Sequence, residues 1–172
     1  GRIVEVYGPE SSGKTTLANA VLNEISFISP DHRIVIIEDV LELQCSVKNA
    51  VFLRTSANID QVGLLRATLR LRPDRIVVGE VRDKSALALL KAWNTGHPGG
   101  IGTVHANSTG AALVRIGQLI QEAGVPAAPE LISETVNMVI SIIRNSAGRR
   151  IDEIAEVISW SSAVGFELRR LG

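Results

Sequence analysis

The sequence predicts an α/β fold, with a mostly parallel sheet flanked by helices and an antiparallel extension at the C-terminal end. Short apolar stretches alternate with longer stretches of helical period over most of the chain, which is typical of strand–helix units around a parallel sheet. Several apolar stretches are rich in Val and Ile, as strands covered on both faces are. Near the C-terminus, strand-like segments follow one another with no helix between them, and this favours antiparallel pairing.

Each predicted strand is an apolar, mostly β-branched run that ends at polar or turn residues. In the strand–helix part of the chain these runs are Arg2–Tyr7, Arg33–Glu38, Ala50–Arg54, Arg75–Glu80 and Ile101–Ala106. In the C-terminal part they are Met138–Arg144 and a pair expected to be antiparallel, Arg149–Trp160 and Gly165–Leu171.

Each predicted helix places apolar residues at helical spacing, so that one face of the helix can pack on the sheet. These helices are Thr15–Ile25, Ile59–Leu71, Lys84–Asn94, Thr109–Gly124 and a short helix near Leu131. Pro73 stops the helix that ends at Leu71, because proline cannot donate the backbone hydrogen bond that a longer helix needs. Gly124 ends the helix that begins at Thr109.

Length and composition indicate a soluble globular domain. The chain has 172 residues, 45% of them hydrophobic and 21% charged, and no repeat, low-complexity tract or long linker divides it. We therefore expect one domain over residues 1–172. The 18 basic and 18 acidic residues cancel, so overall charge does not favour binding to nucleic acid or to an anionic membrane.

The single cysteine and the absence of long apolar runs indicate the cellular compartment of the protein. Cys45 has no partner for an internal disulfide, which fits a reducing compartment. No apolar run approaches the ~18–20 residues that span a bilayer, and no signal peptide precedes the first predicted strand. We therefore expect a cytoplasmic protein without a transmembrane segment.

The segment Gly8–Thr15 fits the phosphate-loop (Walker A) pattern GxxxxGK[ST] and lies between a predicted strand and a predicted helix. The loop amides and the helix N-terminus would surround a phosphate, and Lys14 would reach the β- and γ-phosphates. The Thr15 hydroxyl would ligate Mg²⁺, and Thr16 would hydrogen-bond the α-phosphate. The predicted ligands of ATP and Mg²⁺ in this loop are Gly8, Pro9, Glu10, Ser11, Ser12, Gly13, Lys14, Thr15 and Thr16.

Acidic residues follow two of the predicted strands. Glu38 and Asp39 end one strand, and Glu80, Arg82 and Asp83 follow another. In an open α/β sheet the carboxyl ends of the strands line the ligand crevice, so we expect both groups to face the nucleotide. Hydrolysis needs such acids, because one must support the metal and one must orient the attacking water. The alternative is that they are solvated loop carboxylates.

Histidines supply a further candidate. His97 and His105 flank a Gly-rich turn, and His105 lies at a predicted strand end, where a neutral imidazole could sense or polarise a γ-phosphate. A zinc site is disfavoured because no Cys or third His lies nearby. Either residue could instead make a structural hydrogen bond. His32 is expected to be a solvated surface residue.

The segment RPDRIVVGEVRDKSALALLKAWNTGHPGGIGTVHANS resembles the core of the secretion-superfamily ATPases, in particular the conjugal-transfer (TrbB-type) ATPases of type IV secretion systems. The resemblance extends from about Asn19 to about Trp160. Its motifs are an acidic box IIEDVLEL, a metal-binding strand VVGEVR with Glu in place of the usual Asp, a His box GGIGTVHANS and the tail SAGRRIDEIAEV.

This resemblance implies a RecA-like ATPase domain that forms a hexameric ring. The ring would lie on the cytoplasmic face of the inner membrane, with secretion-machinery proteins as partners, and ATP turnover would drive pilus assembly or substrate transfer. By motif, Glu38 would orient or deprotonate the attacking water, Glu80 would support Mg²⁺ through its water shell, and His105 would sense the γ-phosphate. The arginines implied as charges across a subunit boundary are Arg82, Arg70 and Arg115.

Two departures from the family pattern lead to further expectations. Family members carry an N-terminal domain that supplies arginines to the nucleotide, and this chain starts directly at the first strand, so we expect that domain to be absent. The family's phosphate loop usually reads GGTGSGKTT, whereas GRIVEVYGPESSGKTTLA resembles the equivalent stretch of RecA recombinases. The opening stretch therefore predicts a mosaic chain, such as a chimera.

Three functions fit these observations. The first is an ATP-hydrolysing motor domain of the conjugation and secretion type. The second is a RecA-type core whose ATPase depends on single-stranded DNA; aromatic residues at 3% and a net charge of zero do not support nucleic-acid binding. The third is a nucleotide-binding module with little turnover, because the arginines of the N-terminal domain would be missing.

Overall fold

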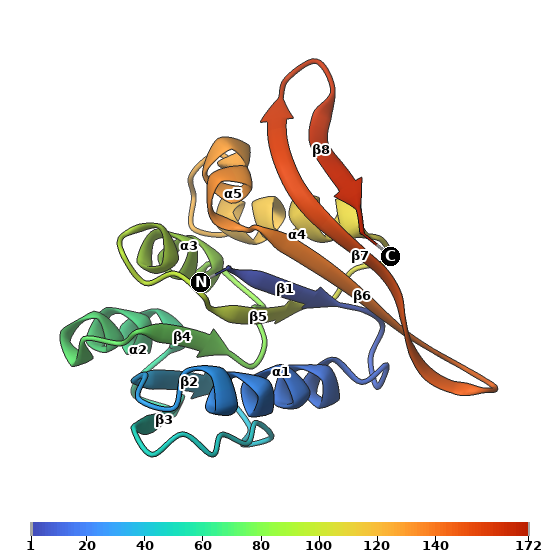
Figure 1. Cartoon of the computed structure of the whole chain (residues 1–172). Coiled ribbons are helices and arrows are strands. Elements are labelled where there is room, and N and C mark those ends of the chain that lie inside the picture. Colours follow the sequence, from blue (N-terminus) through green and yellow to red (C-terminus); the bar gives the residue numbers. More distant parts are fainter. Residues whose placement is uncertain (1, 172) are drawn as a thin grey trace.

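The computed structural model describes residues 2–171 (Figure 1). Its strands are β1 (Val4–Tyr7), β2 (Ile34–Glu38), β3 (Ala50–Arg54), β4 (Arg75–Val78), β5 (Ile101–Val104), β6 (Met138–Asn145), β7 (Gly148–Ser161) and β8 (Gly165–Arg170). Its helices are α1 (Lys14–Ile28), α2 (Gln61–Thr68), α3 (Ser85–Asn94), α4 (Thr109–Gln121) and α5 (Pro129–Thr135), with a 3₁₀ turn η1 (Leu69–Leu71) after α2.

The strands of the described chain form one mixed sheet in the order β3-β2-β4-β5-β1-β6-β7-β8. β1 lies in the middle and pairs in parallel with β5 on one side and β6 on the other, so that Val4 lies opposite both Ile101 and Met138. β2 pairs in parallel with β3 and β4. β7 and β8 continue the sheet in antiparallel pairing. The predicted mostly parallel sheet with an antiparallel C-terminal extension is therefore confirmed.

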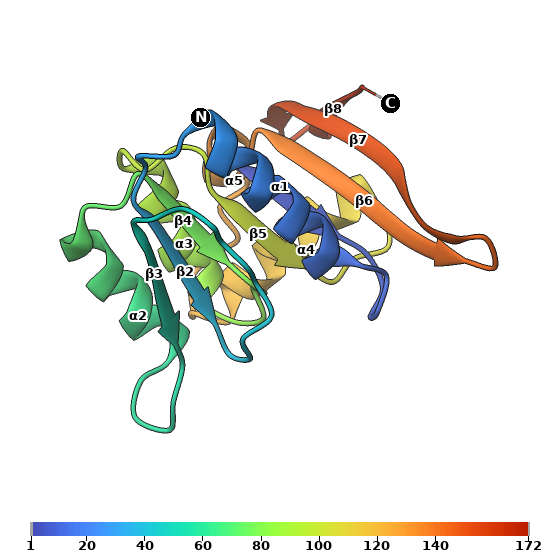
Figure 2. The same ribbon diagram turned by 60° about the horizontal axis from the view of Figure 1, so that its bottom comes forward.

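Helices cover both faces of the parallel part of the sheet (Figures 1 and 2). On one face, Leu22 of α1 packs with Ile34, Ile36 and Val77 of the strands and with Leu43 of the loop after β2. On the other face, helices α2 to α5 contribute to a larger apolar core. Because strands such as β2 are buried on both faces, they read in the sequence as continuous apolar runs.

Several predicted boundaries differ from the structure by a few residues; for example, β5 ends at Val104 and not at Ala106, and α4 ends at Gln121 and not at Gly124. β4 ends at Val78, so Gly79 and Glu80 belong to the loop that follows it. The Gly79 carbonyl accepts a hydrogen bond from the Thr103 side chain at 2.6 Å. The helix predicted over Ile59–Leu71 begins at Gln61 after an Asp60 N-cap, and its last turn tightens into η1.

One histidine prediction is wrong. His32 is half-buried, and its Nδ1 accepts a hydrogen bond from Arg75 Nε at 3.1 Å, so this residue links the α1–β2 turn to the start of β4. The neighbouring Arg33 N–H donates to Asp74 in the same junction, at 2.7 Å. The turn before β2 and the start of β4 meet here. The turn is polar in sequence, but it packs against the neighbouring segment and is not fully exposed to solvent.

None of the helices in residues 2–171 has the length and apolar character needed to cross a membrane.

Candidate functional site

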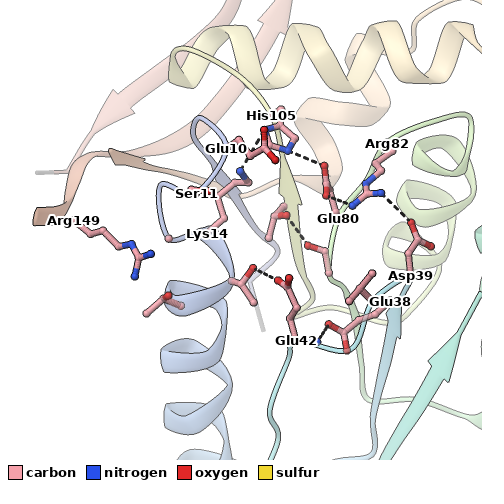
Figure 3. Close-up of a pocket in the computed structure, with 16 residues that line it drawn as sticks. Glu10, Ser11, Lys14, Glu38, Asp39, Glu42, Glu80, Arg82, His105 and Arg149 are labelled. Atoms are coloured by element: carbon pink, nitrogen blue, oxygen red, sulfur yellow. Dashed lines mark hydrogen bonds and ion pairs between the residues drawn. The ribbon is translucent and has the colours of Figure 1, made fainter. Parts of the chain in front are cut away.

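A cavity of about 660 Å³ opens at the carboxyl end of the parallel strands (Figure 3). Its lining comes from the loop after β1, the first turn of α1, the loops after β2 and β4, the end of β5 and the β6–β7 hairpin. These segments are far apart in the sequence and meet because the strands that precede most of them are parallel and adjacent. The site is polar and strongly charged, with acidic and basic side chains facing one another.

The loop after β1 wraps around the N-terminus of α1. Gly13 has a φ of 108°, a left-handed conformation that glycine adopts without strain, and it immediately precedes the helix. Gly8 passes so close to β6 that a Cβ there would lie 2.3 Å from the Ile142 carbonyl oxygen. No side chain of residues 2–171 caps α1 by a hydrogen bond, and its first residues, Lys14, Thr15 and Thr16, line the cavity. Such a helix N-terminus attracts anions through its free N–H groups and its dipole.

Lys14 lies in the first turn of α1 and is largely buried. Its Nζ donates hydrogen bonds to the carbonyl oxygens of Gly8 and Pro9, at 3.1 and 3.0 Å, and lies 3.4 Å from His105 Nδ1. Burial lowers the pKa of Lys14, while the nearby carboxylates of Glu80 and Glu10 act in the opposite direction. The ammonium is therefore held inside the loop, where an incoming phosphate would compensate its desolvation.

The end of β4 supplies an ionic network that crosses the cavity. Glu80 lies between His105 and Arg82: its Oε1 is 2.9 Å from His105 Nε2, and its Oε2 accepts from Arg82 Nη2 at 2.6 Å. Arg82 Nη1 also lies 3.5 Å from Asp39 Oδ2 at the end of β2. The hydrogen bond from Arg82 to Glu80 raises the pKa of Arg82, and Asp39 acts in the same direction. The loops after β2, β4 and β5 are thus connected through side chains.

The backbone near Glu80 is fixed by neighbouring elements. The Glu80 carbonyl oxygen accepts from Gln61 Nε2 of α2 at 3.0 Å, and Gln61 also bonds the buried Ser85 hydroxyl. Val81 N–H donates to the Thr103 carbonyl of β5 at 2.8 Å. These contacts hold the carboxylate in place although it lies on a loop, which is the kind of support that a reacting group needs.

The acidic residue at the end of β2 is almost fully buried. Glu38 is 3% exposed, and its Oε1 accepts from the backbone N–H groups of Glu42 and Leu43 at 3.0 and 2.9 Å. Glu38 Oε2 is also buried and has no hydrogen-bond partner among the described residues. Because a buried carboxylate oxygen without a partner is costly, this atom is suited to a ligand group or water that enters the cavity.

The loop after β2 folds back over α1. Glu42 lies there with its Oε2 2.9 Å from the Thr15 hydroxyl, which donates to it. Asn19 of α1 holds this loop by two hydrogen bonds, donating to the Glu42 carbonyl at 3.2 Å and accepting from the Gln44 N–H at 2.8 Å. Glu42 is not among the predicted site residues, although it is one of the acids of the acidic box IIEDVLEL.

The β6–β7 hairpin adds a basic residue that is also absent from the predicted site residues. Arg149 is exposed, lines the cavity and passes close to the phosphate loop, so that a Cβ at Gly13 would lie 2.7 Å from Arg149 Cδ. The only sequence feature that could have indicated Arg149 is the pair of consecutive arginines in the tail SAGRRIDEIAEV. The sequence could not show that a twisted hairpin places the first of them beside Gly13.

The structure brings together most, but not all, of the predicted site residues. Lys14, Thr15, Thr16, Glu38, Glu80, Arg82 and His105 line the cavity, as do Glu10, Ser11 and Gly13 of the phosphate loop. Arg70 and Arg115 do not line it: Arg70 is exposed, whereas Arg115 is half-buried and donates to Gln118 within α4. His97 also lies apart from the cavity lining, with its Nδ1 2.9 Å from the Pro73 carbonyl, so its contact is structural.

The residues present fit a triphosphate and its metal ion. The loop offers a helix N-terminus that no described side chain caps, a lysine and a buried Ser12 hydroxyl without a partner in the described chain, all of which suit phosphate oxygens. Within residues 2–171 no group of three or more His, Cys, Asp or Glu side chains could hold a metal ion. Mg²⁺ does not need such a group, because it keeps several waters and takes further ligands from the phosphates.

The sheet topology, the phosphate loop and the acidic strand ends together define a phosphate-loop α/β protein. The model of the family "Type II/IV secretion system protein" matches residues 2–164, and this chain belongs to that family. The match includes the opening stretch that resembles RecA recombinases.

Individual relatives agree with this assignment. The probable conjugal transfer protein TrbB of Sinorhizobium fredii (strain NBRC 101917 / NGR234) is 55% identical over 152 residues, which cover 88% of this chain and 47% of that protein. The crystal structure of the VirB11 ATPase from the Brucella suis type IV secretion system, in complex with sulphate, superimposes with a TM-score of 0.83 at 31% identity, covering 90% of this chain and 48% of that chain. The pilus retraction motor PilT with bound ADP gives a TM-score of 0.71 at 28% identity, covering 94% of this chain and 48% of that one. This chain thus spans about half the length of the relatives it matches.

Proposed function

We propose that this chain is an ATP-binding and ATP-hydrolysing motor domain that powers conjugal transfer or type IV secretion. The observation on which this rests is the continuous network from Lys14 through His105 to Glu80, with contacts of 3.4 and 2.9 Å. It connects the phosphate-binding lysine to the acid and the histidine that the family motifs assign to the metal and the γ-phosphate. The names of relatives that include a secretion ATPase and a retraction motor support the same activity.

Each residue has a defined task in this proposal. Lys14 and the α1 N-terminus bind the phosphates, and Thr15 ligates Mg²⁺, which when bound neutralises phosphate charge and helps to align the γ-phosphate. Glu80 would support the metal ion through its water shell, and His105, which touches both Glu80 and Lys14, would respond to the γ-phosphate. Glu38 orients the attacking water with Oε2, the oxygen that has no partner among the described residues.

We further propose that the working form is a hexameric ring on the cytoplasmic face of the inner membrane, in contact with secretion-machinery proteins. Arg82, Arg70 and Arg115 are the arginines proposed to act across its subunit boundaries. The exposed positions of Arg82 and Arg70 fit such a role, because a residue that reaches a neighbouring subunit must be accessible in a single chain; Arg115 is half-buried and only partly accessible.

One assay tests the activity and separates it from the two other functions. We expect phosphate release that requires Mg²⁺, rises steeply with protein concentration and is lost in Lys14→Ala. Hydrolysis that appears only with single-stranded DNA would instead support a RecA-type core. ATP binding without phosphate release at any concentration would identify a nucleotide-binding module with little turnover, and the motor proposal would then be wrong for this chain.

A further inference from the structure

Helices α2 and α3 lie side by side on the sheet face opposite α1, and an open groove of about 490 Å³ runs along them (Figure 1). No residue that lines this groove also lines the nucleotide cavity. We propose that the groove is a docking surface for a partner protein, which binds there through an amphipathic helix with acidic residues beside its apolar face. This role goes beyond the proposed function and does not depend on it.

The floor of the groove is apolar and has the form that a helix requires. Val62, Leu65 and Leu69 of α2 and η1 line it at the spacing i, i+3 and i+7. Leu87 and Ala88 of α3 line it from the other side. Amphipathic helices bind in such grooves through apolar residues at the same spacing. Since α3 has ten residues and is therefore ~15 Å long, the groove offers room for about three turns of a partner helix.

The rim of the groove is basic. Arg66 of α2 and two lysines, Lys84 and Lys91, line the groove, and all three are exposed. The two lysines are seven residues apart and thus lie on the same side of α3, two turns from each other. Within residues 2–171, none of these three side chains makes a hydrogen bond or an ion pair. They are therefore free to pair with the acids of a partner.

Charge complementarity selects the occupant. The whole chain carries equal numbers of basic and acidic residues, yet the described lining of the groove contains three cations and no acid. Complementary charges around an apolar centre raise the association rate and exclude partners of the wrong charge. A helix with glutamate or aspartate beside its apolar face satisfies both the floor and the rim.

Nucleic acid fits this groove less well. Protein contacts with DNA go largely to phosphates through polar groups, and single strands stack on aromatic side chains. Among the described residues that line the groove, Thr95 is the only uncharged polar one, and none is aromatic. Phosphates would pair with the rim and leave the leucines of the floor uncovered.

The test uses two designed, fluorescently labelled peptides of about three to four turns. Both have leucines at i, i+3, i+4 and i+7, with glutamates beside them in one peptide and lysines at the same positions in the other. Binding to the whole chain is measured by fluorescence anisotropy. We expect the acidic peptide to bind at least ~10-fold more tightly than the basic one at low ionic strength, and the difference to shrink as salt is added.

Reversing the charge of the rim is the decisive variant. Arg66→Glu combined with Lys91→Glu should invert the preference, so that the basic peptide binds more tightly, and a misfolded chain could not produce this inversion. Lys48→Glu, at an exposed position outside the groove, should keep the wild-type preference. Leu69→Ser should weaken both peptides by ~5-fold, because Leu69 is the most exposed leucine of the floor, whereas Val164→Ser outside the groove should weaken neither.

Several outcomes would overturn the proposal. These are no binding of the acidic peptide at ~1 mM, equal affinity for both peptides, or a preference that the charge reversal leaves unchanged. Binding of a DNA oligonucleotide that the same reversal abolishes, without binding of the peptide, would identify the groove as a nucleic-acid site. A change of oligomeric state in Leu69→Ser, measured by sedimentation, would show that a second copy of the chain covers it. Lys14→Ala should bind the acidic peptide like the wild type, so failure of the ATPase proposal leaves this one standing.

Discussion

His105 Nε2 and Glu80 Oε1 lie 2.9 Å apart, although the two residues follow different strands and are separated in the sequence by helix α3. The contact follows from the parallel pairing of β4 and β5, which brings the carboxyl ends of both strands to one edge of the sheet. Lys14 approaches the other ring nitrogen of His105. A lysine on Nδ1 and a carboxylate on Nε2 are both satisfied by the neutral tautomer that carries its proton on Nε2. In the proposed function, this pair would connect phosphate binding at Lys14 with Glu80, the acid proposed to support the metal ion.

The first prediction concerns Glu80→Gln. The variant should bind ATP about as well as the wild type and lower turnover by ~100-fold or more, because the charge that supports the metal and orients His105 is lost. Phosphate release and the affinity for a non-hydrolysable ATP analogue are measured side by side. Glu130→Gln, at an exposed position near the start of α5, serves as the control. Unchanged turnover in Glu80→Gln would show that this role is wrong.

The second prediction concerns the lysine of the phosphate loop. Lys14→Ala should weaken ATP binding by ~10–100-fold, because a charge-assisted contact to phosphate is worth roughly 1.5–3 kcal/mol. The ammonium donates only to loop carbonyls and approaches His105 in this structure, so its removal should not unfold the chain. Binding is measured by calorimetry, with Lys48→Ala in the exposed β2–β3 loop as the control. Retained affinity would contradict the assignment of this loop as the phosphate site.

The third prediction uses two adjacent arginines of β7. Successive residues of a strand point to opposite faces, so Arg149 lines the cavity while Arg150 does not and instead pairs with Asp152 at 3.1 Å. Arg149→Ala should weaken nucleotide binding by ~10-fold, and Arg150→Ala should leave it nearly unchanged. Both side chains are exposed, so thermal unfolding should be similar in the two variants. Equal losses of affinity would indicate a general effect of charge and would refute a specific role of Arg149.

The sequence predicted the parts of the site that depend on local chemistry or on sheet topology. The phosphate loop from Gly8 to Thr15 is a local backbone motif, and Glu80 and His105 follow strands whose parallel pairing can be inferred from strand–helix alternation. Glu42 and Arg149 were not predicted, because their positions depend on contacts between distant segments. Glu42 needs Glu38 and Asn19 to hold its loop on α1, and Arg149 needs the course of the β6–β7 hairpin.

Other expectations stay predictions. The family match over residues 2–164 includes the opening stretch, and the structure seats that stretch at the centre of the sheet as β1 and the start of α1. The sequence of this stretch resembles RecA recombinases and suggested a chimeric origin; that origin stays a prediction. The same stretch contains Glu5, in the middle of the apolar strand β1. The sequence shows this residue but does not show the environment of its side chain.

The fourth prediction is a pH dependence of stability caused by Glu5. Its side chain is 1% exposed, and Oε2 has no partner among the described residues. It fits there because Gly102 on β5 has no side chain; a Cβ at Gly102 would lie 2.4 Å from Glu5 Oε1. Burial raises the pKa of Glu5 to about 8, so the folded chain keeps this carboxyl protonated at pH values where the unfolded chain has already lost the proton.

The sign of the effect follows from proton linkage. Between the ordinary pKa of a glutamate, about 4.3, and the pKa of about 8 in the folded state, the unfolded chain binds fewer protons than the folded chain. Glu5 therefore contributes stability that is fully present below about pH 4.3 and is lost as the pH rises through about 8. Within this window the group should lower the free energy of unfolding by up to about 1.4 kcal/mol for each pH unit. Urea unfolding of the wild type and of Glu5→Gln at several pH values should show this slope only in the wild type. Glu122→Gln, an exposed acid after α4, should keep the wild-type slope, and identical slopes in all three chains would show that Glu5 ionises as freely in the folded state as in the unfolded one.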